Sequence, residues 1–496
     1  MLDSLLTCHK PDILDCIANL SNDEVFTPPA VANKMLDLLP SEVWTNPELR
    51  FLDPGCKSGV FLREAAKRLM TGLADAMPDE AARREHIFKN MLHGIAITEL
   101  TAQMARRTLY YSKDASSEHS VVQMPTAEGN IRYQNIAHTF KNGSCVYCGA
   151  PESSARDLGS LESHAYLFIH EALDPSMKFD VIIGNPPYQL STSKDMPNAS
   201  PIYQKFIERA ILMNPRHISM IVPSRWFAGG KGLDEFRTAM RTDKRLATLV
   251  DCPDASECFP GVEVKGGVCY FHWSNHHSGP CDFQTFRGGK IVSRAHRHLD
   301  EFDFIIRNNA AVSILHKVLA VPQPSLEEWM SSQTPYGMHT NFSEFTEKPF
   351  EGAVRLYARG SVGWVAPHHV TKNKDWVHKH QVLLSTAYGG GETEVHQIIG
   401  KPFAVPANSC CTQTYLVAGR FNSADEANNF VSYLKTKMVR FLIGQLKNTQ
   451  HVSPEKVRFV PQPDLSVSWT DELLYAKYGL DAAEIDLIET TIKEMA

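Results

Sequence analysis

The sequence predicts an α/β protein built on a doubly wound parallel sheet and followed by a C-terminal α+β domain. Residues 51–275 alternate short apolar runs with amphipathic segments, the pattern of repeated strand–helix–strand units. After residue 275, glycine, serine, histidine and arginine become frequent, and irregular stretches separate short strands. The length of 496 residues allows both parts to bury a core.

The first predicted unit begins with a helix from Thr27, where two prolines suit a helix start and apolar residues recur at helical spacing. Strand, glycine turn, helix and strand then follow in order, which makes a βαβ unit and hence a parallel sheet. The expected elements are a strand at 50–53, a helix at 60–70, a strand at 92–97 and a helix at 101–111.

The clearest strand of the chain is FDVIIG, residues 179–184, an apolar run bounded by polar residues. The alternation continues with helices at 202–213 and 234–241 and strands at 217–223 and 246–251. The strand at 268–273 follows closely enough to be an antiparallel neighbour. In the C-terminal part we expect strands at 353–358 and 381–386, one long helix at 423–446 and two closing helices at 471–480 and 482–496.

Composition excludes several classes of protein. Hydrophobic residues make up 43% and charged residues 21%, which is ordinary for a globular protein and excludes disorder, collagen and coiled coil. Eleven cysteines are too sparse for a disulfide framework and favour thiols or one metal site. Neither a signal peptide nor an apolar run of ~20 residues is visible, so we expect a cytoplasmic protein without membrane contact.

The first motif with chemical meaning is DPGCKSG, residues 53–59, between a predicted strand and a predicted helix. Glycines in such a turn let the backbone approach a ligand, and the helix N-terminus offers N–H groups to a carboxylate. The phosphate-binding pattern G-x-x-x-x-G-K-S/T occurs nowhere in the chain. By itself, the motif fits an ordinary strand-to-helix turn equally well.

The second motif is NPPY, residues 185–188, directly after the clearest strand. Two prolines hold the backbone in a rigid extended arc at the carboxyl end of a sheet strand, where ligands bind in open α/β sheets. The arc can aim the Asn185 side-chain oxygen and the Pro186 carbonyl at one amino group, while Tyr188 supplies a stacking face. The alternative is a proline-rich loop with a surface tyrosine.

These motifs are similar to those of a known family. DPGCKSG followed by DVIIGNPPY resembles the S-adenosylmethionine-dependent amino-methyltransferases, and TPPAVANKMLDLLP resembles the N-terminal motif of gamma-class N6-adenine DNA methyltransferases. Together with PSRWFAGGKGLDEFR and FPGVEVKGGVCYF, they resemble the type II restriction-modification methylase group over most of residues 25–460. NPPY with its strand is the most specific part.

The resemblance implies a Rossmann-like methyltransferase domain that moves a methyl group from S-adenosylmethionine to a flipped adenine. It implies that Asn185, Pro186, Pro187 and Tyr188 grip the target adenine, with Phe259 as the second aromatic ring stacked on it; the alternative for Phe259 is a residue of the core. The implied cofactor residues are Thr27, Asp53, Gly55 and Gly59. The implied domains are an N-terminal extension (1–24), the methyltransferase domain (25–275, with an insertion at 138–172) and a target-recognition and helical region (276–496).

Two positions depart from the family pattern. Where the family usually places an acidic residue for the ribose hydroxyls, this chain has Ala96, and the nearest carboxylate is Glu99, to which we assign that role. The family's third cofactor motif usually supplies an aspartate, but the corresponding region offers only Asn130 and Asn135. Neither asparagine is assigned a role.

Cys145 and Cys148 form a C-x-x-C pair followed by glycine, the spacing of a zinc knuckle. A full site needs two more ligands. His138 is one candidate, whereas His164 and His170 would not converge on one ion from a single helix. The alternatives are therefore a structural zinc ion or two reduced thiols.

Double-stranded DNA is the expected partner, although the net charge is −6. Basic clusters at 435–458 and 287–298 could contact phosphates, the alternative for the first being a solvated helix face. Arg225, Trp226 and the GGKG loop (229–232) are expected at the rim of the active site. We expect any DNA cleavage to come from a separate nuclease or helicase subunit. Two rival functions remain: an NPPY methyltransferase for RNA or protein glutamine, and a non-catalytic DNA-specificity subunit.

Overall fold

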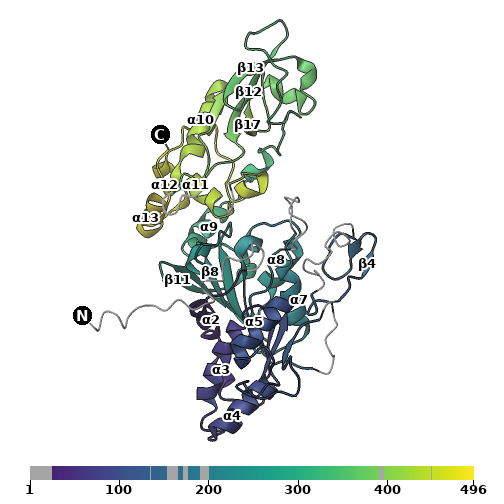
Figure 1. The fold of residues 1–496 in the computed structure, drawn as a ribbon. Coiled ribbons are helices and arrows are strands. Elements are labelled where there is room, and N and C mark those ends of the chain that lie inside the picture. Colours follow the sequence, from purple (N-terminus) through teal and green to yellow (C-terminus); the bar gives the residue numbers. More distant parts are fainter. Residues whose placement is uncertain are drawn as a thin grey trace, which may run out of the picture. The chain divides into compact units, whose positions relative to one another are not determined.

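The computed structural model has two compact units, Met1–Ile305 and Ile306–Ala496 (Figure 1). The residues that it describes are 25–134, 136–152, 166–170, 177–189, 200–389, 396–447 and 450–495. The predicted N-terminal extension, residues 1–24, lies outside the described residues, as do Asn135 and His164.

The first unit is built on a nine-stranded sheet of order β11-β10-β8-β9-β7-β6-β1-β2-β3. The pairings of β9 with β7 and β8 and of β10 with β11 are antiparallel, and the other described pairings are parallel. The antiparallel place predicted for residues 268–273 is thereby confirmed. The strands are β1 (Phe51–Cys56), β2 (Leu92–Ala96), β3 (Ile131–Arg132), β6 (Val181–Gly184), β7 (His217–Pro223), β8 (Leu246–Cys252), β9 (Val268–Ser274), β10 (Cys281–Arg287) and β11 (Lys290–Arg297).

Helices cover both faces of this sheet. On one face, α2 (Pro29–Leu36), α3 (Val60–Gly72) and α5 (Glu99–Tyr110) pack into one apolar core cluster. On the other face, α7 (Tyr203–Leu212) and α8 (Asp234–Thr242) pack into a second cluster. Along β6, Val181 and Ile183 belong to the first cluster and Ile182 to the second, as the alternation of a strand requires. The doubly wound α/β fold predicted from the sequence is confirmed.

The first unit is longer than the sequence suggested. The methyltransferase domain was expected to end at residue 275, but β10 and β11 extend the same sheet, and the division falls after Ile305. The reason is the parallel pairing of β10 with β8, in which Phe283 lies opposite Leu249 and is fully buried. The polar residues before β10 conceal this continuation in the sequence.

The second unit contains two three-stranded sheets and several helices. One sheet joins β13 (Ser361–Val365), β12 (Val354–Ala358) and β16 (Ser409–Cys411), and the other joins β15 (Phe403–Val405), β14 (His380–Ser385) and β17 (Tyr415–Phe421). The helices include α9 (Ala311–Leu319), α10 (Ala424–Lys435), α11 (Lys437–Gly444), α12 (Asp471–Tyr478) and α13 (Ala482–Thr491).

The single long helix predicted at 423–446 is wrong, because α10 and α11 are separate. Between them Thr436 takes an extended conformation (φ −58°, ψ 146°), and its hydroxyl accepts a hydrogen bond from the Val439 N–H. Thr436 therefore begins a new helix as an N-cap residue. Among the described residues, no helix is both long enough and apolar enough to cross a bilayer.

Candidate functional site

The two sequence motifs meet at the carboxyl edge of the sheet. β1 and β6 pair in parallel, with Phe51 opposite Val181, so the residues that follow each strand lie side by side. A Cβ atom on Gly55 would lie 3.4 Å from the Asn185 carbonyl oxygen, and one on Gly184 would lie 2.7 Å from the Asp53 carboxylate. Gly184 therefore allows the loops after β1 and β6 to approach closely, whereas the contact at Gly55 is an ordinary van der Waals one.

Asn185 is buried, and its side chain is held in one orientation. Its amide nitrogen donates hydrogen bonds to the Val25 carbonyl oxygen at 3.0 Å and to the Thr27 hydroxyl at 3.1 Å. Its amide oxygen is also buried but has no hydrogen-bond partner among the described residues. A buried acceptor without a partner is costly, so this oxygen is suited to receive a hydrogen-bond donor from a ligand.

The segment before α2 holds Asn185 in place. The Val25 carbonyl accepts from Asn185 and also from the Lys57 ammonium, at 3.0 Å in each case. Lys57 is itself buried, with 6% of its surface exposed. Thr27 was expected to contact a cofactor. In the structure its hydroxyl accepts a hydrogen bond from the Asn185 amide. Sequence reasoning missed Lys57, although a charged residue inside a turn of small residues was a usable signal.

Asp53 is buried beside Lys57. Burial raises the pKa of Asp53 to about 7, while the Gly55 N–H, at 3.2 Å from its carboxylate, and the charge of Lys57 act in the opposite direction. Burial, together with Asp53, also raises the pKa of the neighbouring Cys56 thiol well above its usual value. Cys56 is therefore a protonated core residue, and Asp53 is a carboxylate that a bound cation would keep ionised.

A cavity of about 360 Å³ opens beside the NPPY loop. Two phenol hydroxyls on its wall, those of Tyr188 and Tyr203, are buried and have no hydrogen-bond partner among the described residues. Burial raises the pKa of Tyr188 well above its usual value, as do the nearby thiols Cys258 and Cys269, while the Asn185 side chain acts the opposite way. Burial also raises the pKa of Tyr203. Both phenols therefore stay protonated, and the cavity combines apolar walls with polar groups that lack partners among the described residues.

The structure places Phe259 in the core, with 1% of its surface exposed, and not on the cavity wall. The wall is formed by the residues after it in the same loop, Val262–Lys265, and by Tyr203 of α7. Tyr203 was missed because a tyrosine on a predicted amphipathic helix is indistinguishable from a core residue. Arg225 is exposed and lines the cavity where the sequence expected it, whereas Trp226 is fully buried.

The remaining cofactor residues lie around the first two strand–helix turns. Gly59 has φ +75° at the N-cap of α3, and a Cβ atom there would lie 3.1 Å from Ala105 of α5. Glu99 is exposed in the first turn of α5, after Ala96 at the end of β2. The Asn130 amide donates to three backbone carbonyls, those of Phe88, Lys89 and Leu92. This explains structurally why Asn130 is present.

The first predicted basic cluster, at 435–458, is mostly used inside the second unit. Arg440 is fully buried and donates to the carbonyls of Lys435, Thr436 and Lys493. Lys437 pairs with Glu489 and Glu494. This cluster is therefore neither the free phosphate-binding surface nor the solvated face that the sequence suggested. The second cluster, at 287–298, lies on β11, an exposed strand at the sheet edge.

Comparison with known proteins gives one family match and one close relative. The model of the Eco57I restriction-modification methylase family matches residues 90–259. An uncharacterized adenine-specific methylase of Mycoplasma pneumoniae is 38% identical over 312 residues, which cover 56% of this chain and 74% of that protein.

Several solved structures are similar at low sequence identity. The type IIL restriction-modification enzyme MmeI in complex with DNA is 12% identical, with a TM-score of 0.47 over 92% of this chain and 65% of that chain. A modification subunit of a putative type I restriction enzyme from Vibrio vulnificus is 15% identical, with a TM-score of 0.35 over 55% of this chain and 50% of that chain. The chain thus spans about half the length of the type I subunits that it matches.

Proposed function

This chain belongs to the adenine-specific methylases of the restriction-modification type, and we propose that it methylates the N6 atom of an adenine flipped out of double-stranded DNA. The observation that carries the proposal is the buried Asn185 amide oxygen, which has no partner among the described residues and is held by Val25 and Thr27. A substrate amino group is a donor that satisfies it.

The N6 atom of adenine is a poor nucleophile because its lone pair is delocalised into the ring. S-adenosylmethionine supplies an electrophilic methyl group when it is bound. Asn185 accepts one N6 hydrogen and, as the family resemblance implies, the Pro186 carbonyl accepts the other. Two fixed acceptors favour a pyramidal nitrogen and stabilise the positive charge that develops on it. The rigid NPPY arc holds both acceptors in place before the substrate arrives.

Asp53, Gly55 and Gly59 are the proposed cofactor residues of the turn after β1, with Thr27 beside them and Glu99 toward the ribose. Asp53 fits a cationic ligand because it is a buried carboxylate, and burial raises its pKa to about 7. The ammonium and sulfonium groups of S-adenosylmethionine would stabilise its ionised form. At Gly55 the turn lies in van der Waals contact with the NPPY loop, because a Cβ atom there would lie 3.4 Å from the Asn185 carbonyl oxygen.

We expect cofactor affinity to depend on pH through Asp53. Without the cofactor, burial raises the pKa of the Asp53 carboxyl to about 7, and a bound S-adenosylmethionine cation favours the ionised form. The dissociation constant should therefore fall roughly tenfold per pH unit as the pH rises toward 7, and level off above it. Isothermal titration calorimetry of the full chain at a series of pH values measures this. An affinity that is flat through pH 7 would contradict the role.

The Asp53→Asn variant provides the control. Because the pKa of about 7 in the folded protein lies above the usual aspartate pKa of 3.8, the folded state holds the proton more tightly than the unfolded chain. The contribution of Asp53 to the free energy of unfolding of the wild type therefore decreases as the pH rises from about 4 to about 7. The variant lacks this decrease, so we expect it to unfold at a higher temperature than the wild type at pH 8, while binding the cofactor weakly at every pH.

The cavity beside Tyr188 is the proposed base pocket. Extrusion of a base costs a few kcal/mol, and stacking on an aromatic ring returns about 1–3 kcal/mol. Tyr188 supplies the stacking face, and Val262 and Val264 line the cavity with it. Phe259 is buried at the start of the same loop, in the core cluster against which Val262 and Val264 pack.

Arg225, on the cavity wall, is proposed to contact a DNA phosphate next to the extruded base. We expect Arg225→Ala to weaken duplex binding severalfold and to reduce the slope of log affinity against log salt by about one. Fluorescence anisotropy at several salt concentrations measures both. The control is Arg84→Ala on α4 (Glu80–His86), which leads toward the opposite, amino end of β2. Equal slopes for wild type and Arg225→Ala would contradict the contact.

Offering labelled S-adenosylmethionine with duplex DNA, RNA or protein to the purified chain tests the function as a whole. We expect label in DNA alone, as N6-methyladenine. Label in RNA or in protein glutamine would overturn the proposal, and so would cofactor and DNA binding without any transfer, the behaviour of a specificity subunit. Cleavage of unmodified DNA is expected to require a separate nuclease or helicase subunit.

A further inference from the structure

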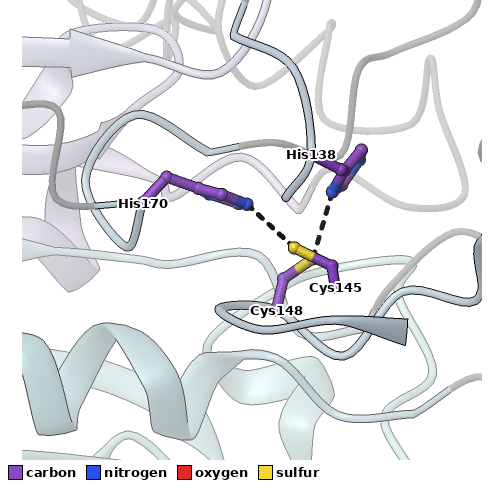
Figure 2. A group of neighbouring side chains, drawn as sticks. All are labelled: His138, Cys145, Cys148 and His170. Carbon is purple, nitrogen blue, oxygen red and sulfur yellow. Dashed lines mark hydrogen bonds between the residues drawn. The ribbon is translucent and has the colours of Figure 1, made fainter. Parts of the chain in front are cut away.

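Four potential metal ligands converge in the insertion between β3 and β6. They are His138, Cys145, Cys148 and His170, and their ligand atoms all lie within 4.8 Å of one another (Figure 2). Cys145 and Cys148 come from the predicted C-x-x-C pair, His138 precedes it, and His170 lies in a separate segment, 166–170. No role in methyl transfer requires these side chains.

Two sulfur-to-nitrogen distances in this cluster match those of one tetrahedral ion. With bonds of about 2.3 Å from zinc to sulfur and about 2.0–2.1 Å from zinc to nitrogen, a sulfur and a nitrogen on one tetrahedron lie about 3.5 Å apart. The Cys145 Sγ lies 3.4 Å from the His170 Nε2, and the Cys148 Sγ lies 3.4 Å from the His138 Nδ1. Figure 2 shows each of these pairs with the histidine nitrogen directed at a sulfur.

The backbone around the cysteines has the form of a zinc knuckle. β4 (Phe140–Lys141) and β5 (Ser144–Cys145) make a hairpin, with φ +54° at Asn142 and +78° at Gly143 in its turn. Gly149, at φ +77°, lets the chain fold back so that its N–H donates to the Cys145 carbonyl at 2.9 Å. The N–H groups of Tyr147 and Cys148 point at the Cys145 thiol, and that of Ala150 at the Cys148 thiol.

His170 is oriented by a second interaction. Its Nδ1 lies 2.8 Å from the Tyr166 carbonyl oxygen, which fixes the proton on Nδ1 and directs the lone pair of Nε2 toward Cys145. Metal-bound histidines are commonly held in this way by a backbone carbonyl. The cysteines are free thiols, so no disulfide occupies their sulfurs.

We propose that these four residues bind one structural zinc ion, which fastens residues 166–170 to the β4–β5 hairpin. Four protein ligands leave no open position, so the ion is structural and not catalytic. The fastened segment backs α7: the rings of Tyr166 and Phe168 lie 5.5 Å and 5.7 Å from that of Phe206. α7 also carries Tyr203 of the proposed base pocket. By fixing residues 166–170, the ion therefore stabilises the segment that packs against this helix.

The test measures metal content and is independent of methyl transfer. The full chain, purified from zinc-supplemented culture, should contain about one zinc ion by mass spectrometry. Cys145→Ser and His170→Ala should each lose most of it. Cys281→Ser, which matches Cys145 in having 3% of its surface exposed, and His119→Ala, whose side chain is 84% exposed, should retain the full amount.

Replacing the metal of the wild-type protein with Co²⁺ gives a test that does not depend on whether the variants fold. Co²⁺ in a site of two thiolates and two imidazoles should give strong visible absorption of tetrahedral cobalt, with sulfur-to-cobalt charge transfer in the near ultraviolet. Removing the ion with a chelator should lower the unfolding temperature of the wild type and leave that of Cys145→Ser unchanged. Wild-type protein that contains no zinc and takes up neither zinc nor cobalt overturns the proposal, as does full zinc content in both ligand variants.

Discussion

Asn185→Ala is expected to lower the rate constant of methyl transfer by about 100- to 1,000-fold, the usual effect of removing one preorganised polar contact to a reacting centre. The variant loses the buried oxygen that receives the N6 hydrogen, while the turn after β1 stays intact. Its affinity for S-adenosylmethionine should therefore stay within about threefold of that of the wild type. Single-turnover transfer to unmethylated DNA and calorimetric cofactor titration measure the two effects separately.

Two further variants sharpen this prediction. Asn185→Asp keeps an acceptor but loses the amide donors to the Val25 carbonyl and the Thr27 hydroxyl, so it should also transfer slowly. Asn275→Ala is the matched control, because the Asn275 amide oxygen is likewise buried without a partner among the described residues, but lies beyond the end of β9. Near-normal transfer by Asn185→Ala, or an equal loss in Asn275→Ala, would refute the role of Asn185.

Tyr188→Ala is expected to lower the rate of DNA methylation by about 5- to 150-fold, the equivalent of the 1–3 kcal/mol that base stacking supplies. The rate falls because stacking on the Tyr188 ring no longer offsets the free energy of extruding the adenine from the duplex. Cofactor binding should be unchanged. The measurement is the single-turnover rate on unmethylated DNA, combined with the fluorescence of 2-aminopurine placed at the modified position, once sequencing of methylated bases has located the site.

Tyr188→Phe separates stacking from the hydroxyl. It keeps the ring and removes a buried hydroxyl without a partner among the described residues, so it should retain most of the activity and the fluorescence change. Equal losses in Tyr188→Phe and Tyr188→Ala would assign the effect to the hydroxyl. Full activity of Tyr188→Ala would exclude stacking altogether.

Much of the first unit could be predicted from the sequence because its determinants are local. An apolar run such as FDVIIG forms a buried strand wherever it pairs, and two prolines fix the loop after it without help from distant residues. The parallel alternation then required the loops after β1 and β6 to reach the same edge of the sheet. Long-range order followed from short-range patterns at these positions.

The parts that failed depend on contacts between distant residues. The family resemblance pointed to Phe259 as the second ring stacked on the base, but Phe259 is buried in the core, and Val262 and Val264 line the cavity. The basic residues at 435–458 were predicted to form an exposed DNA-binding surface. In the structure, Arg440 donates to a carbonyl of the segment after α13, and Lys437 pairs with carboxylates of α13 and of that segment. His170 was set aside as a ligand because one continuous helix was assumed to carry both it and His164. Neither the charge of a residue nor its spacing along the chain shows which distant residues contact its side chain in the folded protein.

The shared Val25 carbonyl has a consequence for how the protein folds. The hydrogen bonds that orient Asn185 join residues 160 and 158 positions apart in sequence, so they can close only after this long-range contact forms and are expected late in folding. During synthesis, no nascent chain shorter than 185 residues can hold Asn185 in its working orientation. A folding intermediate can thus form β1, α3 and the cofactor turn and yet be unable to methylate. In a refolding experiment, cofactor binding should return before methyl transfer does.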